Sequence, residues 1–278
     1  MLHALLNDGR TRPRLGLGVG RVADDQTRTA VADALRAGYR AIDTASRYGN
    51  ETGVGRAVAA SGIARSDLYV TTKVWNDEQG YDRTLRAFDA SLDRLGLDYA
   101  DSYLIHWPAP ELNAYLDTWR ALVRLRSEGR VHSIGVCNFT EPLLERLVQE
   151  SGEVPAVNQI ELHPYLSRME LRGANARHGV LTEAWSPLGQ GRGMLADPVL
   201  RTVADKHGRS PAQVVLRWHL QLGNAVIPKS VTPSRIRENI DVFDFVLDAE
   251  DLTAIAALNR DEHCGQDPAT YRRAFTTG

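Results

Sequence analysis

The feature of this sequence that most limits its fold is a regular alternation of short apolar runs with longer stretches of helical periodicity. Residues 68–73 form a β-rich run, the apolar residues between 85 and 95 follow helical spacing, and residues 103–106 form the next run. Along the chain, eight short strands are separated by helices, with no low-complexity linker between them. Strict alternation of strand and helix predicts a parallel sheet.

Eight such units close naturally into a (β/α)8 barrel, the TIM barrel. The alternative is a doubly wound open sheet, which would need a phosphate-binding glycine loop after its first strand. Gly16, Gly18 and Gly20 are spaced G-x-G-x-G rather than G-x-G-x-x-G, so they indicate a first strand of small residues instead. A polar turn at residues 7–9 predicts a short N-terminal β-hairpin over residues 2–15. We therefore expect a single α/β barrel domain over residues 1–278.

Composition argues against several classes of protein. The formal net charge is -2 and no basic block occurs, which disfavours a nucleic-acid partner or a membrane-surface partner. No apolar N-terminal segment follows a basic start, so we expect neither a secretion signal nor a transmembrane helix. The two cysteines, Cys137 and Cys264, are far apart in the sequence. These features predict a cytoplasmic protein with two thiols and no disulfide.

Polar, ionisable or aromatic residues end most of the predicted strands. In chain order they are Asp43, Lys73, His106, Asn138, Gln159, Trp185 and Lys229. The carboxyl ends of barrel strands converge on one face, where the chemistry of such barrels takes place. A histidine or lysine at a single strand end is often structural. A whole series of such residues on one face indicates an active site.

Four residues near these strand ends form a set suited to proton donation. Tyr48 follows Asp43 by five residues on a glycine-containing loop. A lysine beside Tyr48 would lower the pKa of the phenol, and Lys73 can fill that place while Asp43 keeps it charged. Tyr48 would then protonate a carbonyl oxygen as hydride reaches its carbon, and His106 would hold that oxygen by a hydrogen bond.

Other kinds of active site fit the sequence less well. Cysteine, histidine and aspartate do not occur together at the spacing of a metal site, and the proton-donating set needs no metal. A Ser-His-Asp hydrolase is a further alternative. However, no G-x-S-x-G elbow occurs, and Ser46 has no motif around it.

The segment after the last predicted strand indicates an anion site, because barrels often hold phosphate there. With Thr232 as N-cap and Pro233 in the first turn, the following helix would point its free N–H groups at an anion. Lys229 and Arg235 add two positive charges. Two cations favour the 2′-phosphate of NADP over a ribose diol, with NADH as the alternative cofactor. Trp185 is suited to stack on a nicotinamide ring, or else is a core tryptophan.

The sequence resembles the aldo-keto reductases over nearly its whole length. The matching motifs lie at residues 38–45, 48–51, 72–75, 105–108, 135–139, 158–164 and 228–230. Residues 185–191 and 238–245 are most similar to the bacterial branch that includes 2,5-diketo-D-gluconate reductase. The resemblance implies a (β/α)8 barrel that reduces aldehydes or ketones to alcohols with NADPH.

The resemblance also implies roles for individual residues. The catalytic tetrad falls on Asp43, Tyr48, Lys73 and His106, with Tyr48 as proton donor. The cofactor-binding positions fall on Asn138, Gln159, Trp185, Ser186, Leu188, Gln190, Lys229, Ser230, Val231, Thr232, Arg235, Glu238 and Asn239. We expect a small-molecule carbonyl substrate and a monomer. The alternatives are a non-catalytic NADP(H)-binding regulatory protein on the same barrel, and a phosphate-binding barrel isomerase or lyase.

Three features depart from the family's pattern. Cys137 stands where serine is usual, and a thiol is a weaker hydrogen-bond donor to the cofactor amide. Gly20 stands where relatives usually carry a large pocket-lining residue, and the tail after Asp261 is short. We therefore expect an open pocket that accepts bulky ketones and is lined by Gly20, Trp75, Trp107 and Tyr271.

Overall fold

The computed structural model describes residues 2–268, and within them it confirms the predicted barrel. An eight-stranded parallel sheet has the order β10-β9-β8-β7-β6-β5-β4-β3. Its strands are β3 (Leu17–Gly18), β4 (Ala41–Asp43), β5 (Tyr69–Val74), β6 (Ala100–Ile105), β7 (Val131–Cys137), β8 (Val157–Glu161), β9 (Leu181–Trp185) and β10 (Ala225–Val226). The two edges meet, because Leu15 pairs with Val226 and the Gly16 amide donates to the Val226 carbonyl at 2.9 Å. The sheet is therefore closed, as a barrel requires.

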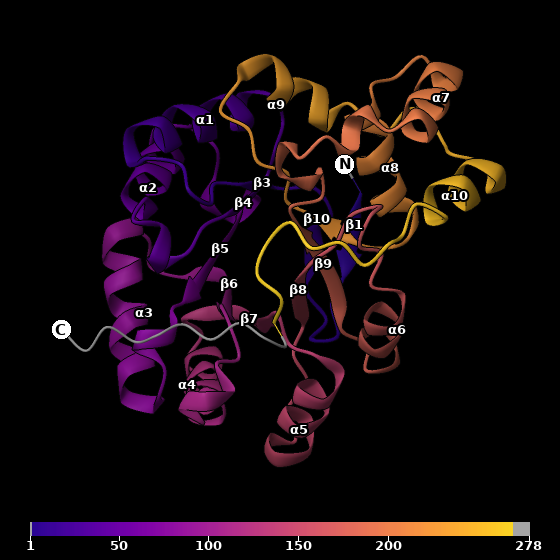
Figure 1. The fold of residues 1–278 in the computed structure, drawn as a ribbon. Coiled ribbons are helices and arrows are strands. Elements are labelled where there is room, and N and C mark those ends of the chain that lie inside the picture. The colour runs from indigo at the N-terminus through magenta and orange to yellow at the C-terminus, as the bar shows by residue number, and fades with distance from the viewer. Residues whose placement is uncertain (1, 269–278) are drawn as a thin grey trace.

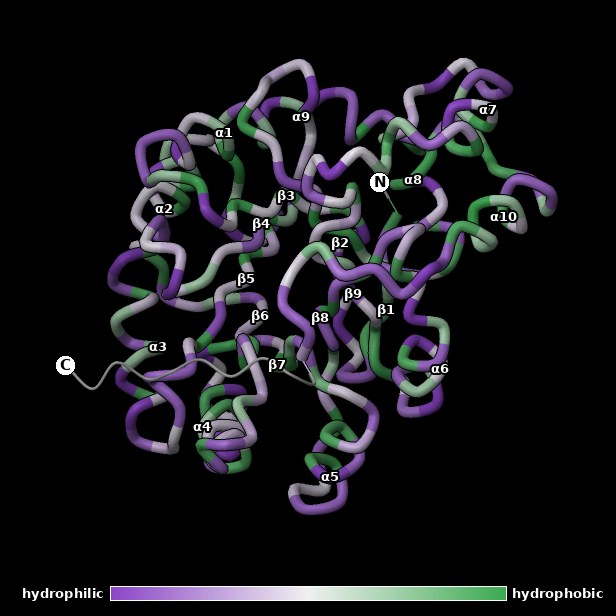
Figure 2. Tube along the Cα trace, viewed as in Figure 1, coloured by the Kyte–Doolittle hydropathy of each residue, from purple (hydrophilic) through white to green (hydrophobic). Residues whose placement is uncertain are grey.

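Helices surround this sheet (Figure 1). They are α1 (Asp24–Arg36), α2 (Glu51–Ala59), α3 (Tyr81–Leu95), α4 (Tyr115–Ser127), α5 (Glu141–Ser151), α6 (Met169–Arg177), α7 (Pro198–His207), α8 (Pro211–Gln221), α9 (Pro233–Ile240) and α10 (Ala249–Ala256). Each carries both hydrophilic and hydrophobic residues along its length, as a helix with one face on a sheet does (Figure 2). The sequence did not lead us to expect α7.

The helix starts differ in how their first backbone amides are capped. The capping box at Ser210 is present at α8, and the Asp248 carboxylate caps α10. Helix α1 has Ala23 as its N-cap and no side-chain cap, although the acidic residues Asp24 and Asp25 follow directly. The Asp24 carboxylate instead accepts from the Gly53 amide at 2.6 Å, so it joins α1 to α2.

The predicted N-terminal hairpin pairs β1 (His3–Leu5) with β2 (Thr11–Pro13) in antiparallel fashion. Leu6 packs against Ala156 and Val157, where β8 begins. The Asn7 side-chain amide donates to the Pro155 carbonyl at 2.9 Å. The hairpin therefore lies at the amino ends of the strands, opposite the end where the site residues gather.

The core lies between the sheet and its helices. Apolar side chains such as Val31, Ile42 and Val70 are buried between the helices and the strands. Helices α2 and α3 approach very closely, because a Cβ on Gly55 would lie only 2.0 Å from the Leu95 carbonyl oxygen. Glycine is required at this position. None of the helices within residues 2–268 is long and apolar enough to cross a membrane.

Candidate active site

The four residues of the predicted tetrad meet at the carboxyl ends of neighbouring strands. Asp43 ends β4, Lys73 lies one residue before the end of β5, and His106 follows β6 directly. Tyr48 ends a short 3-10 helix, Ser46–Tyr48, after β4. Asp43, Lys73 and His106 are all buried. The topology therefore brings together residues that are up to 63 positions apart in the sequence.

Lys73 and Asp43 form a buried ion pair. The Lys73 ammonium donates to the Asp43 carboxylate at 2.5 Å and to the Thr44 carbonyl at 2.9 Å. Burial disfavours the charged lysine, but the Asp43 carboxylate and the Tyr48 phenol outweigh burial and raise the Lys73 pKa. Lys73 is therefore a fixed positive charge at neutral pH.

Tyr48 lies between this charge and His106. Its hydroxyl is 3.4 Å from His106 Nε2, and Lys73 Nζ is 5.3 Å from the centre of its ring. Burial raises the pKa of Tyr48 to about 12, while Lys73 acts in the opposite direction. Lys73 thus acts as expected, but our expectation of a lowered Tyr48 pKa was wrong because burial is the larger effect. The phenol is fully protonated near neutral pH.

His106 is a neutral imidazole in this environment. Burial lowers its pKa well below the ordinary value, and the positive charges of Lys73 and Arg47 lower it further. Its ring packs edge-to-face against Tyr48 and against Trp75, with ring centres 5.4 Å and 5.0 Å away. A neutral ring held in this way orients a substrate oxygen without adding charge.

Asn138 links His106 to Trp185. Its side-chain amide donates to the His106 carbonyl at 3.0 Å, and its oxygen accepts from the Trp185 indole N–H at 2.9 Å. The backbone of Asn138 has a φ of 63°, a left-handed conformation that asparagine tolerates better than most residues. Trp185 is half-buried, so it is not simply a core tryptophan.

Gln159 spans the barrel at the level of the tetrad. Its amide nitrogen donates to Asp43 Oδ2 at 2.8 Å and to Glu183 Oε2 at 2.9 Å. Both N–H groups are therefore used inside the protein, and the Gln159 oxygen is what remains for a ligand. The Cys137 thiol contacts this oxygen only weakly, at a distance of 3.9 Å.

The loop after β9 contains the residues expected near the cofactor pyrophosphate. Ser186 and Gln190 both have a φ of 52°, and the Gln190 amide donates to the Ser186 hydroxyl at 2.8 Å. Leu188 packs partly against the core. The loop therefore has a defined shape with polar groups at its surface.

The predicted phosphate segment is exposed. Lys229, Val231, Thr232 and Arg235 all lie at the surface, and within residues 2–268 neither Lys229 nor Arg235 makes an ion pair. Thr232 is the N-cap of α9 and Pro233 its first residue, as predicted, but the Thr232 side chain does not cap the helix. Two unpaired cations beside a helix N-terminus fit a phosphate group.

Three further residues of this segment either form hydrogen bonds within the protein or are buried. The Ser230 hydroxyl accepts from the Thr232 amide at 3.1 Å. The Glu238 carboxylate accepts from the Ser210 hydroxyl at the start of α8. Asn239 is buried. Glu238 and Asn239 therefore shape the base of the segment, and their predicted closeness to an adenine stays a prediction.

The C-terminal segment crosses the site and is held there by Glu161, a residue that the sequence did not single out. The Glu161 carboxylate accepts from the backbone amides of Cys264 at 2.6 Å and Gly265 at 2.9 Å, and lies 3.0 Å from His263 Nδ1. A Cβ on Gly265 would lie 2.4 Å from the Trp185 ring. The segment therefore packs directly on the predicted nicotinamide-stacking residue.

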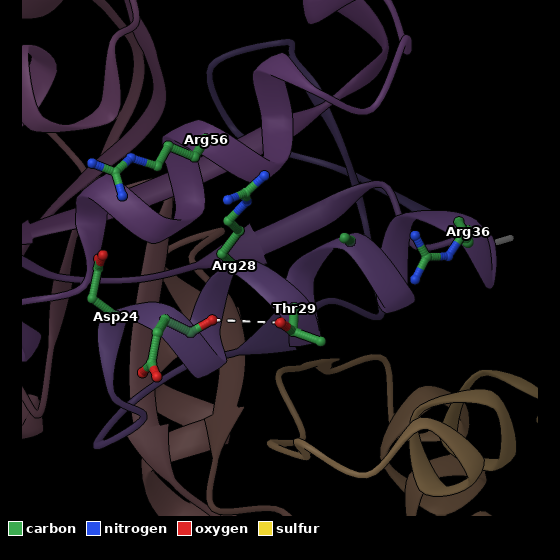
Figure 3. A pocket seen from close by; sticks show the side chains of 7 residues that line it. Asp24, Arg28, Thr29, Arg36 and Arg56 are labelled. Carbon is green, nitrogen blue, oxygen red and sulfur yellow. Dashed lines mark hydrogen bonds between the residues drawn. The ribbon is translucent and has the colours of Figure 1, made fainter.

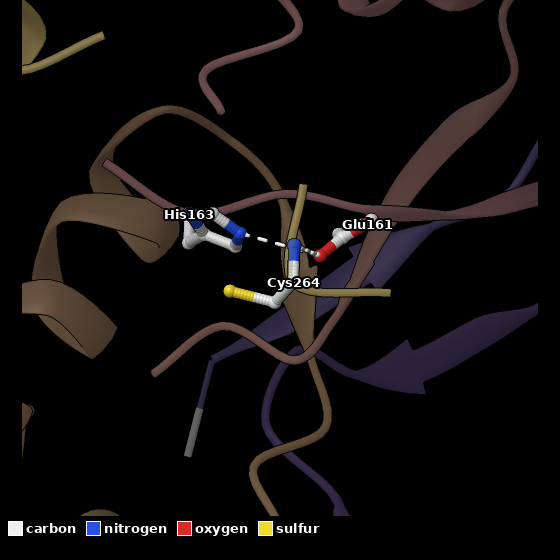
Figure 4. A group of neighbouring side chains, drawn as sticks. All are labelled: Glu161, His163 and Cys264. Atoms are coloured by element: carbon white, nitrogen blue, oxygen red, sulfur yellow. Dashed lines mark hydrogen bonds and ion pairs between the residues drawn. The ribbon is translucent and has the colours of Figure 1, made fainter. Parts of the chain in front are cut away.

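Glu161 also belongs to a buried group with the donor atoms of a metal site (Figure 4). The ligand atoms of Glu161, His163 and Cys264 lie within 4.8 Å of one another. Both Glu161 oxygens, however, already face N–H groups of the protein. Burial opposes ionisation of Glu161, but these hydrogen bonds outweigh it and lower its pKa. The hydrogen bonds alone account for the arrangement.

The predicted substrate side of the site lies above Tyr48. A Cβ on Gly20 would be 3.4 Å from Tyr48 Cζ, so any larger residue here would cover the phenol. Trp75 packs on His106, and the Trp107 carbonyl accepts from the Gln79 amide at 2.7 Å. Tyr271 lies outside the described residues.

A separate groove of ≈ 430 Å³ lies between α1 and α2 on the outer helical layer (Figure 3). It is lined by charged side chains that include Asp24, Arg28, Arg36 and Arg56. None of its lining residues belongs to the tetrad or to the cofactor positions.

Known proteins resemble this chain over almost its whole length. The model of the Aldo/keto reductase family matches residues 13–260. An aldo-keto reductase of Mycolicibacterium smegmatis is 58% identical over 266 residues, which cover 96% of this chain and 96% of that protein. The methylglyoxal reductase DkgA of Yersinia pestis is 51% identical over 267 residues, with 96% of each chain covered. A solved structure of a Gox0644 mutant in complex with NADPH has a TM-score of 0.94 at 49% identity, covering 98% of this chain and 99% of that chain.

Proposed function

This chain belongs to the aldo/keto reductase family and reduces aldehydes or ketones to alcohols with NADPH, and we propose that Tyr48 is the proton donor of the reaction. The observation that carries the proposal is the position of the Tyr48 hydroxyl, 3.4 Å from a neutral His106 and next to the buried charge of Lys73. His106 orients the carbonyl oxygen toward the phenol. Tyr48 gives that oxygen its proton, and Lys73 stabilises the phenolate that is left.

NADPH, when bound, supplies the hydride. We propose that Asn138 and Gln159 hold its carboxamide, and the support is that both Gln159 N–H groups are used within the protein while its oxygen stays available as an acceptor. Trp185 offers for stacking the part of its ring that Gly265 does not contact. Lys229 and Arg235 supply the unpaired charge that a 2′-phosphate requires. The other cofactor positions named from the sequence complete this proposed binding site.

We propose that the open space above Tyr48 accepts bulky ketones, because Gly20 places no side chain there. The similarity to the branch that includes 2,5-diketo-D-gluconate reductase stays a prediction. We further propose that the chain is a single domain that acts as a monomer in the cytoplasm. Cys137 and Cys264, which both lie in the described part of the chain, are free, and the candidate site is assembled within one chain.

The replacement Tyr48→Phe tests this function. NADPH consumption would be followed by absorbance with an aldehyde panel that includes methylglyoxal, for wild type and variant. We expect Tyr48→Phe to lower kcat/KM by about 10²- to 10⁴-fold, the usual contribution of a positioned general acid. NADPH binding should survive, because the phenol is not a proposed cofactor contact.

Two outcomes would contradict the proposal. Unchanged turnover in Tyr48→Phe would remove Tyr48 as proton donor. A wild-type protein that binds NADPH but reduces no carbonyl compound would favour the regulatory alternative. Tyr165→Phe is the matched control, because its hydroxyl bonds to Asp197, the N-cap of α7, rather than to a residue of the tetrad.

A further inference from the structure

The inside of this barrel contains an arginine from the N-terminal hairpin. Arg12 is 2% exposed and forms an ion pair with Glu183 of β9. Its guanidinium also lies over the ring of Tyr69, 5.0 Å from the ring centre. Tyr69 belongs to β5, and β5 and β9 are four strands apart in a barrel of eight. Arg12 therefore reaches the axis of the barrel.

A continuous chain of polar contacts leads from Arg12 to the tetrad. Glu183 accepts from Arg12 through Oε1 and from the Gln159 amide through Oε2. The same Gln159 nitrogen donates to Asp43, and Asp43 holds Lys73. Gln159 and Asp43 also lie on opposite sides of the barrel, on β8 and β4. The chain of contacts thus crosses the barrel from its hairpin end to its catalytic end.

Ion pairs are an expensive way to fill a barrel. The interior of such a barrel is usually packed with branched apolar side chains. Burying two charged side chains costs the free energy of removing them from water, and apolar side chains of similar volume do not have that cost. The presence of a buried ion pair is therefore weak evidence that it serves stability alone. Here the pair is joined to the residues that orient the reacting groups, which gives it a second role.

We propose that Arg12 and Glu183 are positioning residues for the carbonyl reduction. Glu183 holds the Gln159 amide so that its oxygen faces the cofactor carboxamide, and Arg12 balances the Glu183 charge so that Lys73 and Tyr48 experience a neutral interior. The proposal rests on the proposed function, since it assigns the pair to the same site.

The charged groups around this network are consistent with the proposed charge balance between Arg12 and Glu183. Tyr48 is faced by Lys73 of β5, Asp43 of β4, Cys137 of β7 and His106 after β6, with Arg47 beside His106. Glu183 acts on Asp43 and Cys137, and Tyr69 lies beside Arg12 with Asp101 acting on it in turn. Two cations, Arg12 and Lys73, thus offset two carboxylates, Glu183 and Asp43.

The orienting role is tested in variants that carry no charge at either position. Arg12→Met/Glu183→Gln keeps one oxygen that accepts from Gln159, whereas Arg12→Met/Glu183→Leu keeps none. We expect the second double variant to bind NADPH about tenfold more weakly than the first, as loss of one buried hydrogen bond predicts. Equal NADPH dissociation constants would overturn this role.

The electrostatic role is tested by comparing Glu183→Gln with Arg12→Met/Glu183→Gln. Both carry glutamine at 183, but the single variant leaves the Arg12 charge unbalanced. An extra positive charge stabilises the phenolate, so the Tyr48 pKa should be about one unit lower in the single variant. We would measure it from the pH dependence of alcohol oxidation. We would also measure it by NMR of the isotope-labelled tyrosine ζ carbon in cofactor-free protein, with the Tyr48 signal assigned by its absence in Tyr48→Phe.

A purely structural pair gives a different result. If the pair only stabilised the fold, Arg12→Met would lower the melting temperature by about 10 °C. The NADPH dissociation constants would then be equal within the first pair of variants, and the Tyr48 pKa would be equal within the second pair. Arg126→Met, which breaks the surface pair with Glu153, is the control and should shift neither quantity. The NMR and binding comparisons need no turnover. A wild-type enzyme without carbonyl reduction would therefore contradict the proposed function and leave the positioning proposal to be decided separately.

Discussion

The two ends of the candidate site differ in how their charges are held. At the catalytic end, Lys73 and Asp43 are buried and each has its hydrogen-bond partners within the protein. At the phosphate end, Lys229 and Arg235 are exposed and make no ion pair within residues 2–268. The catalytic end is therefore organised before any ligand arrives, whereas the phosphate end is completed by the ligand itself.

This difference follows from what each end does. A group that transfers a proton must already be oriented and desolvated when the substrate arrives, because reorganisation during the reaction would slow it. A group that binds a permanent dianion can stay in water, because the ligand brings the partner charge. Substitutions at the catalytic end should therefore lower both turnover and stability, whereas substitutions at the phosphate end should weaken cofactor binding.

The largest effect is expected for Lys73→Met. It removes the charge that stabilises the Tyr48 phenolate and leaves the buried Asp43 carboxylate unpaired. We expect kcat/KM to fall by about 10³-fold or more, and the free energy of unfolding to fall by about 3–5 kcal/mol. Kinetics and denaturant unfolding measure the two losses.

The matched control is Lys206→Met, which removes a lysine that pairs with Asp248 at the surface. It should leave kcat/KM unchanged. A Lys73→Met variant as active as this control would show that the catalytic end does not depend on its buried charge.

A smaller effect, confined to binding, is expected for Arg235→Met. Loss of a charge-assisted contact to the 2′-phosphate should raise the NADPH dissociation constant by about 10- to 100-fold and leave the unfolding free energy unchanged. NADH lacks this phosphate and should bind equally well to wild type and variant. Fluorescence titration with both cofactors measures this.

Arg237→Met is the control for this substitution, because Arg237 is exposed on the same helix, α9. Equal losses for NADH and NADPH in Arg235→Met would remove Arg235 from the 2′-phosphate site. The comparison between the two ends would then be supported at the catalytic end alone.

The catalytic end was the easier of the two to predict from the sequence. Parallel strands bring their carboxyl ends to one face, so Asp43, Lys73 and His106 could be placed together once the strands were counted. The Arg12–Glu183 pair was missed, because Arg12 comes from a hairpin outside the repeating pattern and its path through the barrel depends on the three-dimensional packing. Glu161 was read only as part of a motif. Its partners, His263 to Gly265, lie more than 100 residues later.

A third substitution concerns the open part of the catalytic end. Gly20→Phe places a ring over Tyr48, where a Cβ alone would lie 3.4 Å from Cζ. We expect kcat/KM for a bulky aryl ketone to fall about tenfold relative to methylglyoxal, the loss expected when a pocket is filled. Gly20→Ala is the matched variant and should change this ratio little. Unchanged turnover of the bulky ketone in Gly20→Phe would show that substrates do not occupy this space.

The smallest effect is expected from a change of pH, which should leave kcat unchanged at the catalytic end but change cofactor binding at the phosphate end. This test needs no substitution. The pKa of Tyr48 is raised to about 12, that of Lys73 is raised, and that of His106 is lowered well below its ordinary value. Between about pH 6 and about pH 9 the phenol therefore keeps its proton, the lysine its charge and the imidazole its neutrality. The kcat for reduction should be flat over this range. A sigmoid change with a midpoint inside it would mean that one of these three groups titrates there.

The phosphate end should respond to the same pH change in its binding constant. A phosphate monoester takes up its second proton near pH 6, so free NADPH carries less negative charge below that pH and must lose this proton to bind as the dianion. Its attraction to Lys229 and Arg235 weakens accordingly, and the NADPH dissociation constant should rise severalfold between about pH 7 and about pH 5 while that of NADH stays constant. A parallel rise for both cofactors would instead place the titrating group in the protein, since NADH carries no monoester phosphate.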